Sequence, residues 1–256
     1  MKGTYSRAIR KDIWADSSLL WPPEDILPLH CDKCSIAQNR LEQVPFPSRP
    51  ILRKGRILVL SEYPSYTGLP EGDPNPLHGT TWDVLDRVCY YLQIGQIDFS
   101  YSTIIRCWRK PSHMVTQSEY TKCREYVSLM AAITEAPVII TLGSMVTKFS
   151  FPDELTFKDG KFIGTQKLRT TWTDKPHNTI YGIPGVPTEH PSNVRLVRCN
   201  TQINFRTICV DFMRAIDYAA KSSNEYAAIA ASMERNVYRK DYEELLKSAQ
   251  AKGTVK

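Results

Sequence analysis

Two of the seven cysteines have the spacing of a metal-binding pair. Cys31 and Cys34 are separated by two residues, which lets two thiolates reach one metal centre from a single turn. Zinc sites, iron–sulfur clusters and redox dithiols all use this spacing. Most of the remaining cysteines are far apart in the sequence, and three of them are interpreted as core residues or ordinary thiols: Cys89, Cys199 and Cys209.

A glutamate and a histidine stand at the ends of predicted strands. Glu62 follows the apolar run 57–60, which is typical of a buried parallel strand. His190 lies in the loop 187–192, after a segment that leads out of a strand. A glutamate at such a position is commonly a solvated loop residue or a helix cap, and an isolated histidine is commonly structural. The role of both residues therefore depends on the pattern around them.

The elements that would position these residues alternate between strand and helix. Short apolar runs predict strands at these positions: 57–60, 102–105 and 138–142. Apolar residues at helical spacing predict helices at these positions: 80–92, 118–133, from Ser144 onward, 205–219, and a mixed-charge helix over 224–249. The polar, turn-rich stretch 150–180 predicts a hairpin excursion.

This alternation predicts an α/β fold, a three-layer α/β/α sandwich with a short, mainly parallel central sheet. In sheets of this kind the active site lies at the carboxyl ends of the strands. We expect three loops to meet at that edge: 61–79, 106–117 and 187–197.

Composition excludes several classes of protein. The chain has 256 residues, of which 42% are hydrophobic and 23% charged, so it is neither a disordered polymer nor a disulfide-stapled miniprotein. The net charge of +6 is compatible with nucleic acid as a partner, although many cytosolic proteins are as basic. The sequence has neither a secretory signal nor an apolar run of about 18 residues, so we expect a cytoplasmic protein without a membrane partner. Structural disulfides are not expected there.

Several local patterns follow one another in a fixed order: Cys31-x2-Cys34; Leu60-Ser-Glu62-Tyr-Pro64; Pro76-Leu-His-Gly79; Ile105-Arg-Cys107; Cys123; Pro137-Val-Ile-Ile-Thr-Leu-Gly143; and Pro187-Thr-Glu-His190-Pro-Ser192. Together they resemble the iron–sulfur uracil-DNA glycosylases, family 4 of the uracil-DNA glycosylase superfamily. The resemblance covers residues 31–220 and implies a glycosylase-like α/β domain there. It leaves an N-terminal arm over 1–30 and a C-terminal helical extension over 221–256.

The resemblance implies a [4Fe–4S] cluster. The four cysteines that hold the cluster in this family correspond to these residues: Cys31, Cys34, Cys107 and Cys123. Ligation by four thiolates is the normal cage for such a cluster. The alternative is a zinc ion on the first pair, with Cys107 and Cys123 as small buried residues.

The resemblance also implies catalytic roles for Glu62 and His190. Enzymes of this family flip a nucleotide out of DNA, hold the edge of its base and let water attack C1′ of the sugar. Glu62 matches the glutamate of the first strand loop, where it would position the water or stabilise the positive charge that develops on the sugar. His190 matches the family's loop histidine, which would donate a hydrogen bond to O2 of the departing pyrimidine.

The base pocket departs from the family pattern. Leu77 replaces a phenylalanine that stacks on uracil, and Thr103 replaces the asparagine that reads the uracil edge. Threonine lacks the two-ended amide that can bind O4 and N3–H together. Tyr63 stands where the family has a small residue, and we expect it, Leu77, His78 and Thr103 to recognise the base.

Candidate DNA contacts lie in two loops. Trp108, Arg109 and Lys110 follow the third cysteine and are suited to backbone contact and stacking, or they form a solvated basic loop. In the second loop Ser192 would bind a phosphate through its backbone N–H, and three residues would fill the space of the flipped base or bind a phosphate: Val194, Arg195 and Leu196. The alternative is that Val194 and Leu196 begin a helix and face the core.

These features predict a monofunctional DNA glycosylase that excises a pyrimidine-type base and leaves an abasic site. No pocket motif supplies a Schiff-base lysine, so strand cleavage is not expected. The altered pocket favours a modified base, such as the hydroxymethylated or glucosylated cytosine of phage DNA, and hence a role in antiviral defence. The alternatives are a conventional uracil repair glycosylase and a catalytically inactive protein that binds DNA or assists replication.

Overall fold

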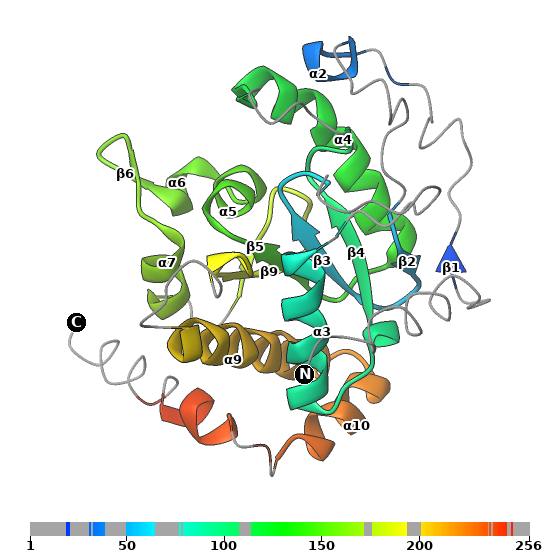
Figure 1. Ribbon diagram of the computed structural model, residues 1–256, viewed down its shortest axis with the longest axis vertical. Coiled ribbons are helices and arrows are strands. Elements are labelled where there is room, and N and C mark those ends of the chain that lie inside the picture. Colours follow the sequence, from blue (N-terminus) through cyan, green and yellow to red (C-terminus); the bar gives the residue numbers. More distant parts are fainter. Residues whose placement is uncertain are drawn as a thin grey trace.

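A five-stranded sheet forms the centre of the computed structural model (Figure 1). Its strands stand in this order: β4 (Phe99–Thr103), β3 (Ile57–Ser61), β5 (Ile139–Leu142), β9 (Pro184–Thr188) and β8 (His177–Asn178). The first four run parallel, and β8 pairs antiparallel with β9 at one edge. All residues of β3 are buried, as expected of a central strand that is covered on both faces.

The structure describes part of the chain, and the statements below concern those residues: 19–20, 31, 33–38, 50–64, 77, 79–107, 114–171, 176–193, 201–234, 236, 238–244 and 247. Within them, no helix is long and apolar enough to cross a membrane. Three short elements precede the sheet: β1 (Leu19–Leu20), which pairs with β2 (Leu52–Arg53), and the single-turn helix α2 (Ser35–Gln38).

Helices cover both faces of the sheet. One apolar core joins Val59 of β3 to α3 (Thr80–Leu92) and α9 (Thr201–Ala219). A second core, on the opposite face, joins Leu60 to α4 (Gln117–Thr134) and α5 (Ser144–Ser150). Successive residues of a strand point to opposite faces, so β3 contributes to both cores. A mainly parallel α/β architecture with helices on both faces of the sheet was predicted and is confirmed.

The C-terminal segment packs on the same core as the sheet. It contains α10 (Asn224–Ser232), which lies at one end of α9 (Figure 1), and a further helical stretch over 239–244. Tyr226 of α10 is fully buried, and its hydroxyl accepts a hydrogen bond from the backbone N–H of Ile57 at 2.8 Å. The predicted extension is therefore helical in two parts and is tied to the first residue of β3.

The strand predicted over 102–105 begins and ends earlier than expected. In β4, Phe99 and Tyr101 enter the first core, while small serines alternate with them. The apolar residues Ile104 and Ile105 come after the strand and pack into the second core. Their backbone N–H groups donate to the carbonyl oxygens of Ser61 and Glu62, each at 2.9 Å. The apolar run therefore marked the exit from the strand rather than the strand itself.

The region 150–180 contains more than the predicted hairpin. The hairpin is formed by β6 (Phe157–Lys158) and β7 (Lys161–Phe162). Two short helices flank it: α6 (Asp153–Thr156) and α7 (Thr165–Thr171). Leu168 of α7 is buried against Phe151, so the excursion has a small apolar core of its own.

One further short element, the 3-10 helix η1 (Gln96–Asp98), precedes β4.

Candidate active site and thiol cluster

Glu62 is held at the carboxyl end of β3 through both its backbone and its side chain. Its carbonyl oxygen accepts a hydrogen bond from the backbone N–H of Ile105 at 2.9 Å. The hydroxyl of Tyr120, on α4, donates to Glu62 Oε1 at 2.5 Å. The carboxylate is half-buried, so it has a fixed orientation and still reaches solvent. One oxygen is thus engaged by tyrosine, and a carboxylate can accept further hydrogen bonds on the other.

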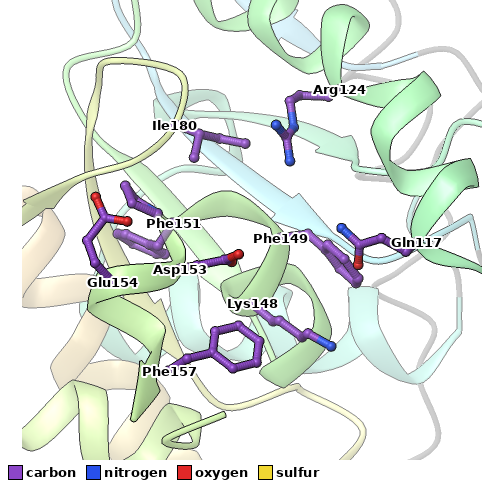
Figure 2. Close-up of a pocket in the computed structure, with 10 residues that line it drawn as sticks. Gln117, Arg124, Lys148, Phe149, Phe151, Asp153, Glu154, Phe157 and Ile180 are labelled. Atoms are coloured by element: carbon purple, nitrogen blue, oxygen red, sulfur yellow. The ribbon is translucent and has the colours of Figure 1, made fainter. Parts of the chain in front are cut away.

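Tyr120 is itself fixed by an aromatic stack. Its ring lies 3.8 Å from that of Phe149 on α5, with an angle of 21° between the planes. Phe149 also lines a cavity of ≈ 400 Å³ formed by residues of α4, α5 and α6, together with Arg124 and Lys148 (Figure 2). None of the residues predicted for the site lines this cavity.

His190 lies beyond the end of β9 and has a defined tautomer. Its Nδ1 accepts a hydrogen bond from the backbone N–H of Ser192 at 3.2 Å and lies 2.7 Å from the Ser192 hydroxyl. Since a backbone N–H can only donate, Nδ1 is an acceptor, and the neutral ring carries its proton on Nε2. Burial lowers the pKa of His190 to about 4, so the ring is neutral at pH 7. Among the described residues, no hydrogen-bond partner occupies Nε2.

Gly143 separates the two candidate catalytic residues. It follows β5, which lies between β3 and β9 in the sheet. Its φ is +88°, and a Cβ built on it would lie 2.9 Å from Cβ of His190. Only glycine combines this backbone conformation with such close contact. Adjacent strands are about 4.8 Å apart, so the backbones leading to Glu62 and His190 are about 10 Å apart at the same edge of the sheet.

The four cysteines implied as cluster ligands lie in one buried region. All four are free of disulfides, are at most 8% exposed, and belong to the second core. Burial raises the pKa of the Cys123 thiol to about 12, with smaller contributions from the other three thiols. They come from the α2 region, the end of β4 and the middle of α4, so the fold brings distant segments together.

Two hydrogen-bond donors reach these thiols. The backbone N–H of Arg106 donates to the sulfur of Cys123. The hydroxyl of Tyr126 donates to Cys31 Sγ at 3.8 Å. In the described part of the chain, no three cysteine, histidine or acidic side chains are grouped as ligands of a metal ion. Four cysteine thiols are the ligand type of a [4Fe–4S] cluster, and hydrogen bonds to the sulfurs tune the potential of such clusters.

Two of the residues predicted to recognise the base are enclosed by protein. Thr103 is fully buried, and its hydroxyl donates to the carbonyl oxygen of Ile105 at 2.7 Å. Leu77 is 1% exposed and packs in the first core. Tyr63 is half-buried against the second core, beside Glu62. Of these three residues, Tyr63 alone has a side chain that is partly exposed to solvent.

Several predicted site residues lie outside the described residues: His78, Trp108, Arg109, Lys110, Val194, Arg195 and Leu196. Their predicted roles in base or DNA binding stay predictions. Ser192 is described, and it contacts the imidazole of His190. Cys89 and Cys209 are buried in the first core, as predicted for core residues.

Sequence reasoning missed Tyr120, Arg106 and Tyr126. Tyr120 and Tyr126 are three residues before and after Cys123, so helical spacing places all three on neighbouring turns of one face of α4. That spacing could have indicated that the tyrosines approach the thiols. It could not have indicated that Tyr120 reaches Glu62, which is 58 residues away in the sequence.

No family model matches the sequence, and no curated protein matches it.

Proposed function

We propose that this protein is a monofunctional DNA glycosylase that hydrolyses the N-glycosidic bond of a flipped pyrimidine-type base. The observation that carries the proposal is the pairing of a fixed carboxylate, Glu62, with a neutral imidazole, His190, at one edge of a parallel sheet. The geometry suits glycosidic cleavage, in which opposite charges develop on the sugar and on the base.

His190 would act on the departing base. As the bond between C1′ and the base nitrogen breaks, its electrons move into the base and collect on the carbonyl oxygen O2. The Nε2–H of neutral His190 would donate to that oxygen, and this hydrogen bond strengthens as the charge grows. Ser192 holds the ring in the required tautomer through Nδ1.

Glu62 would act on the sugar. Its negative charge stabilises the positive charge that develops at C1′ in the transition state. The oxygen that Tyr120 does not engage would hold the water that attacks C1′, and the proton of that water passes to the carboxylate. The base leaves as an anion and takes up a proton, Glu62 releases the proton that it accepted, and the products are the free base and an abasic site.

Four cysteines would hold a [4Fe–4S] cluster: Cys31, Cys34, Cys107 and Cys123. When bound, the cluster supplies a covalent tie between the segments that carry these residues. Ile105 and Tyr120, which hold Glu62, are two and three residues from Cys107 and Cys123 respectively. The tie would therefore fix the geometry of Glu62 while taking no part in the reaction.

The substrate that we propose is a modified pyrimidine in DNA, such as a hydroxymethylated or glucosylated cytosine, which would give the protein a role in defence against phage. The absence of the family's phenylalanine and asparagine supports this choice. Since Thr103 and Leu77 are enclosed, Tyr63 is the described residue that we propose contacts the base.

The test is excision from a panel of DNA duplexes that contain uracil, hydroxymethylcytosine, glucosylated hydroxymethylcytosine or hypoxanthine, followed by alkaline cleavage of abasic sites. We expect excision of at least one modified cytosine. Excision of uracil alone would indicate a repair glycosylase, and binding without excision of any base would indicate an inactive DNA-binding protein.

His190→Ala and Glu62→Gln should each lower single-turnover excision by about 100-fold or more, because each removes a group that acts in the transition state. DNA binding, measured by fluorescence anisotropy, should change little. The matched controls are His177→Ala, on the edge strand β8, and Glu135→Gln, which removes a surface ion pair with Lys54. Excision by His190→Ala at the wild-type rate would contradict the mechanism.

A further inference from the structure

Arg106 is a buried cation that the proposed reaction does not use. It lies between β4 and Cys107, and 3% of its surface is exposed. Its guanidinium lies 5.1 Å from the centre of the Tyr126 ring. Its Nε and Nη1 are buried and have no hydrogen-bond partner among the residues that the structure describes.

Burial is the largest influence on the charge of Arg106, and the titratable groups that act on it are thiols and a phenol. The groups that act on its charge are Tyr126 and three of the four clustered cysteines: Cys107, Cys123 and Cys31. Glu125, the acidic neighbour of Tyr126, is paired with Lys33 at the surface. Neutral thiols cannot balance a buried guanidinium, and leaving such a charge unpaired is strongly unfavourable.

An anion at the centre of the thiols would remove this imbalance. Four thiolates around a [4Fe–4S] core carry a net negative charge, and their sulfurs accept hydrogen bonds. Hydrogen bonds and charges near such a cluster set its reduction potential. Arginine offers several N–H donors, and in Arg106 the buried Nε and Nη1 have no partner among the described residues.

We propose that Arg106 is the counter-ion of the metal cluster, with its side-chain N–H groups donating to the cluster or its thiolates. This inference rests on the proposed cluster and is independent of the proposed base excision. It assigns Arg106 two effects, which are retention of the cluster and a raised reduction potential, because a nearby cation stabilises the more negative, reduced form.

Other roles for Arg106 fit the geometry less well. A contact with DNA phosphate requires an accessible guanidinium, and this one is buried. Stacking on Tyr126 alone would leave Nε and Nη1 without partners in an apolar region. Arg87 is a matched control for stacking, because its guanidinium lies 5.0 Å from the centre of the Phe205 ring. Unlike Arg106, it is exposed, and it belongs to α3, on the opposite face of the sheet from the four thiols.

The test uses full-length protein purified without oxygen as wild type, Arg106→Met, Arg106→Gln, Arg106→Lys and Arg87→Met. Iron and sulfide are quantified, loss of the visible absorption is followed in excess chelator, and the midpoint potential is measured by redox titration with electron paramagnetic resonance. We expect Arg106→Met and Arg106→Gln to lose the cluster at least tenfold faster. At a fixed potential the ratio of reduced to oxidised cluster should fall about tenfold in these variants. This corresponds to a midpoint potential that is lower by about 59 mV for a one-electron couple.

Arg106→Lys keeps the charge and should stay within about threefold of wild type in both measurements, as should Arg87→Met. If Arg106→Met does not fold, the Gln and Lys variants provide the same comparison. An unchanged potential in both neutral variants would overturn the inference, because a packing role alone does not depend on charge. Protein that contains zinc or no metal would overturn it as well. Excision from the base panel is measured separately. If no base is excised, the glycosylase proposal fails, but the measurements of cluster retention and midpoint potential still test the role of Arg106.

Discussion

At the scale of single residues, the candidate site depends on side chains that are oriented by one neighbour each. Ser192 fixes the tautomer of His190, and Tyr120 fixes Glu62. In both pairs the orienting group is a neutral donor, so it orients the candidate catalytic group without adding a charge beside it. The two pairs can be tested separately.

Tyr120→Phe should lower excision by about tenfold, because Glu62 loses the donor that orients it, whereas the stack on Phe149 is retained. The free energy of unfolding should fall by about 1.5–3 kcal/mol, the usual contribution of a hydrogen bond to a charged group. Single-turnover kinetics and urea unfolding measure the two effects. Tyr90→Phe is the control, since Tyr90 is 79% exposed. Equal excision by the two variants would show that Tyr120 does not orient Glu62.

The depressed pKa of His190 links folding to pH. In the unfolded chain the imidazole binds a proton below its ordinary pKa of 6.5, whereas in the folded protein it does so below about 4. The unfolded state therefore holds more protons between these values, and stability is lost as the pH falls from about 6.5 to about 4. The loss from this residue should be about 3 kcal/mol. Urea unfolding of wild type and His190→Gln at pH 7 and pH 4.5 measures it, and equal losses in the two proteins would refute it.

At the scale of secondary structure, α4 connects the thiol cluster with the candidate catalytic edge. A capping box fixes its first turn: the backbone N–H of Thr116 donates to Glu119, and the backbone N–H of Glu119 donates to the Thr116 hydroxyl. The next turns carry Tyr120, Cys123 and Tyr126 on the face toward the sheet. A displacement of this helix would therefore disturb the thiols and Glu62 together.

The turn from β5 into α5 gives a prediction at the same scale. Gly143→Ala should destabilise the fold by about 1–3 kcal/mol, because of both a strained positive φ and the contact with His190. It should also lower excision by about tenfold or more, since His190 must move. Gly160→Ala is a matched control: its φ is +71°, and a Cβ there meets nothing within 4 Å. If both variants excise equally well, the contact between Gly143 and His190 has no role in catalysis.

At the scale of the whole molecule, periodicity predicted the elements well and their contacts poorly. The helix expected over 80–92 has those bounds, because its apolar stripe is regular and Gly79 precedes it. The failure at β4 arose because alternating serine and aromatic residues form the strand, while the isoleucines after it serve the opposite core. Hydrophobicity shows that a residue is buried, but it does not identify the face on which it is buried.

The candidate site was predicted only in part, because its contacts join segments that are far apart in the sequence. Cys31, Cys34, Cys107 and Cys123 could be grouped from the sequence because a resemblance related them, and the fold does bury them together. The enclosure of Thr103 and the hydrogen bond between Tyr120 and Glu62 depend on contacts between distant segments. Local patterns carry no information on such contacts.

The order of the strands has a consequence for the protein during its synthesis. All four clustered thiols, β3, β4 and α4 belong to residues 31–134, whereas His190 follows β9, which joins the sheet beside β5. Domains generally fold as units during synthesis. The four thiols therefore leave the ribosome before the strands that complete the sheet have been made. Until β9 joins β5, the nascent chain holds these cysteines outside the finished core and open to solvent.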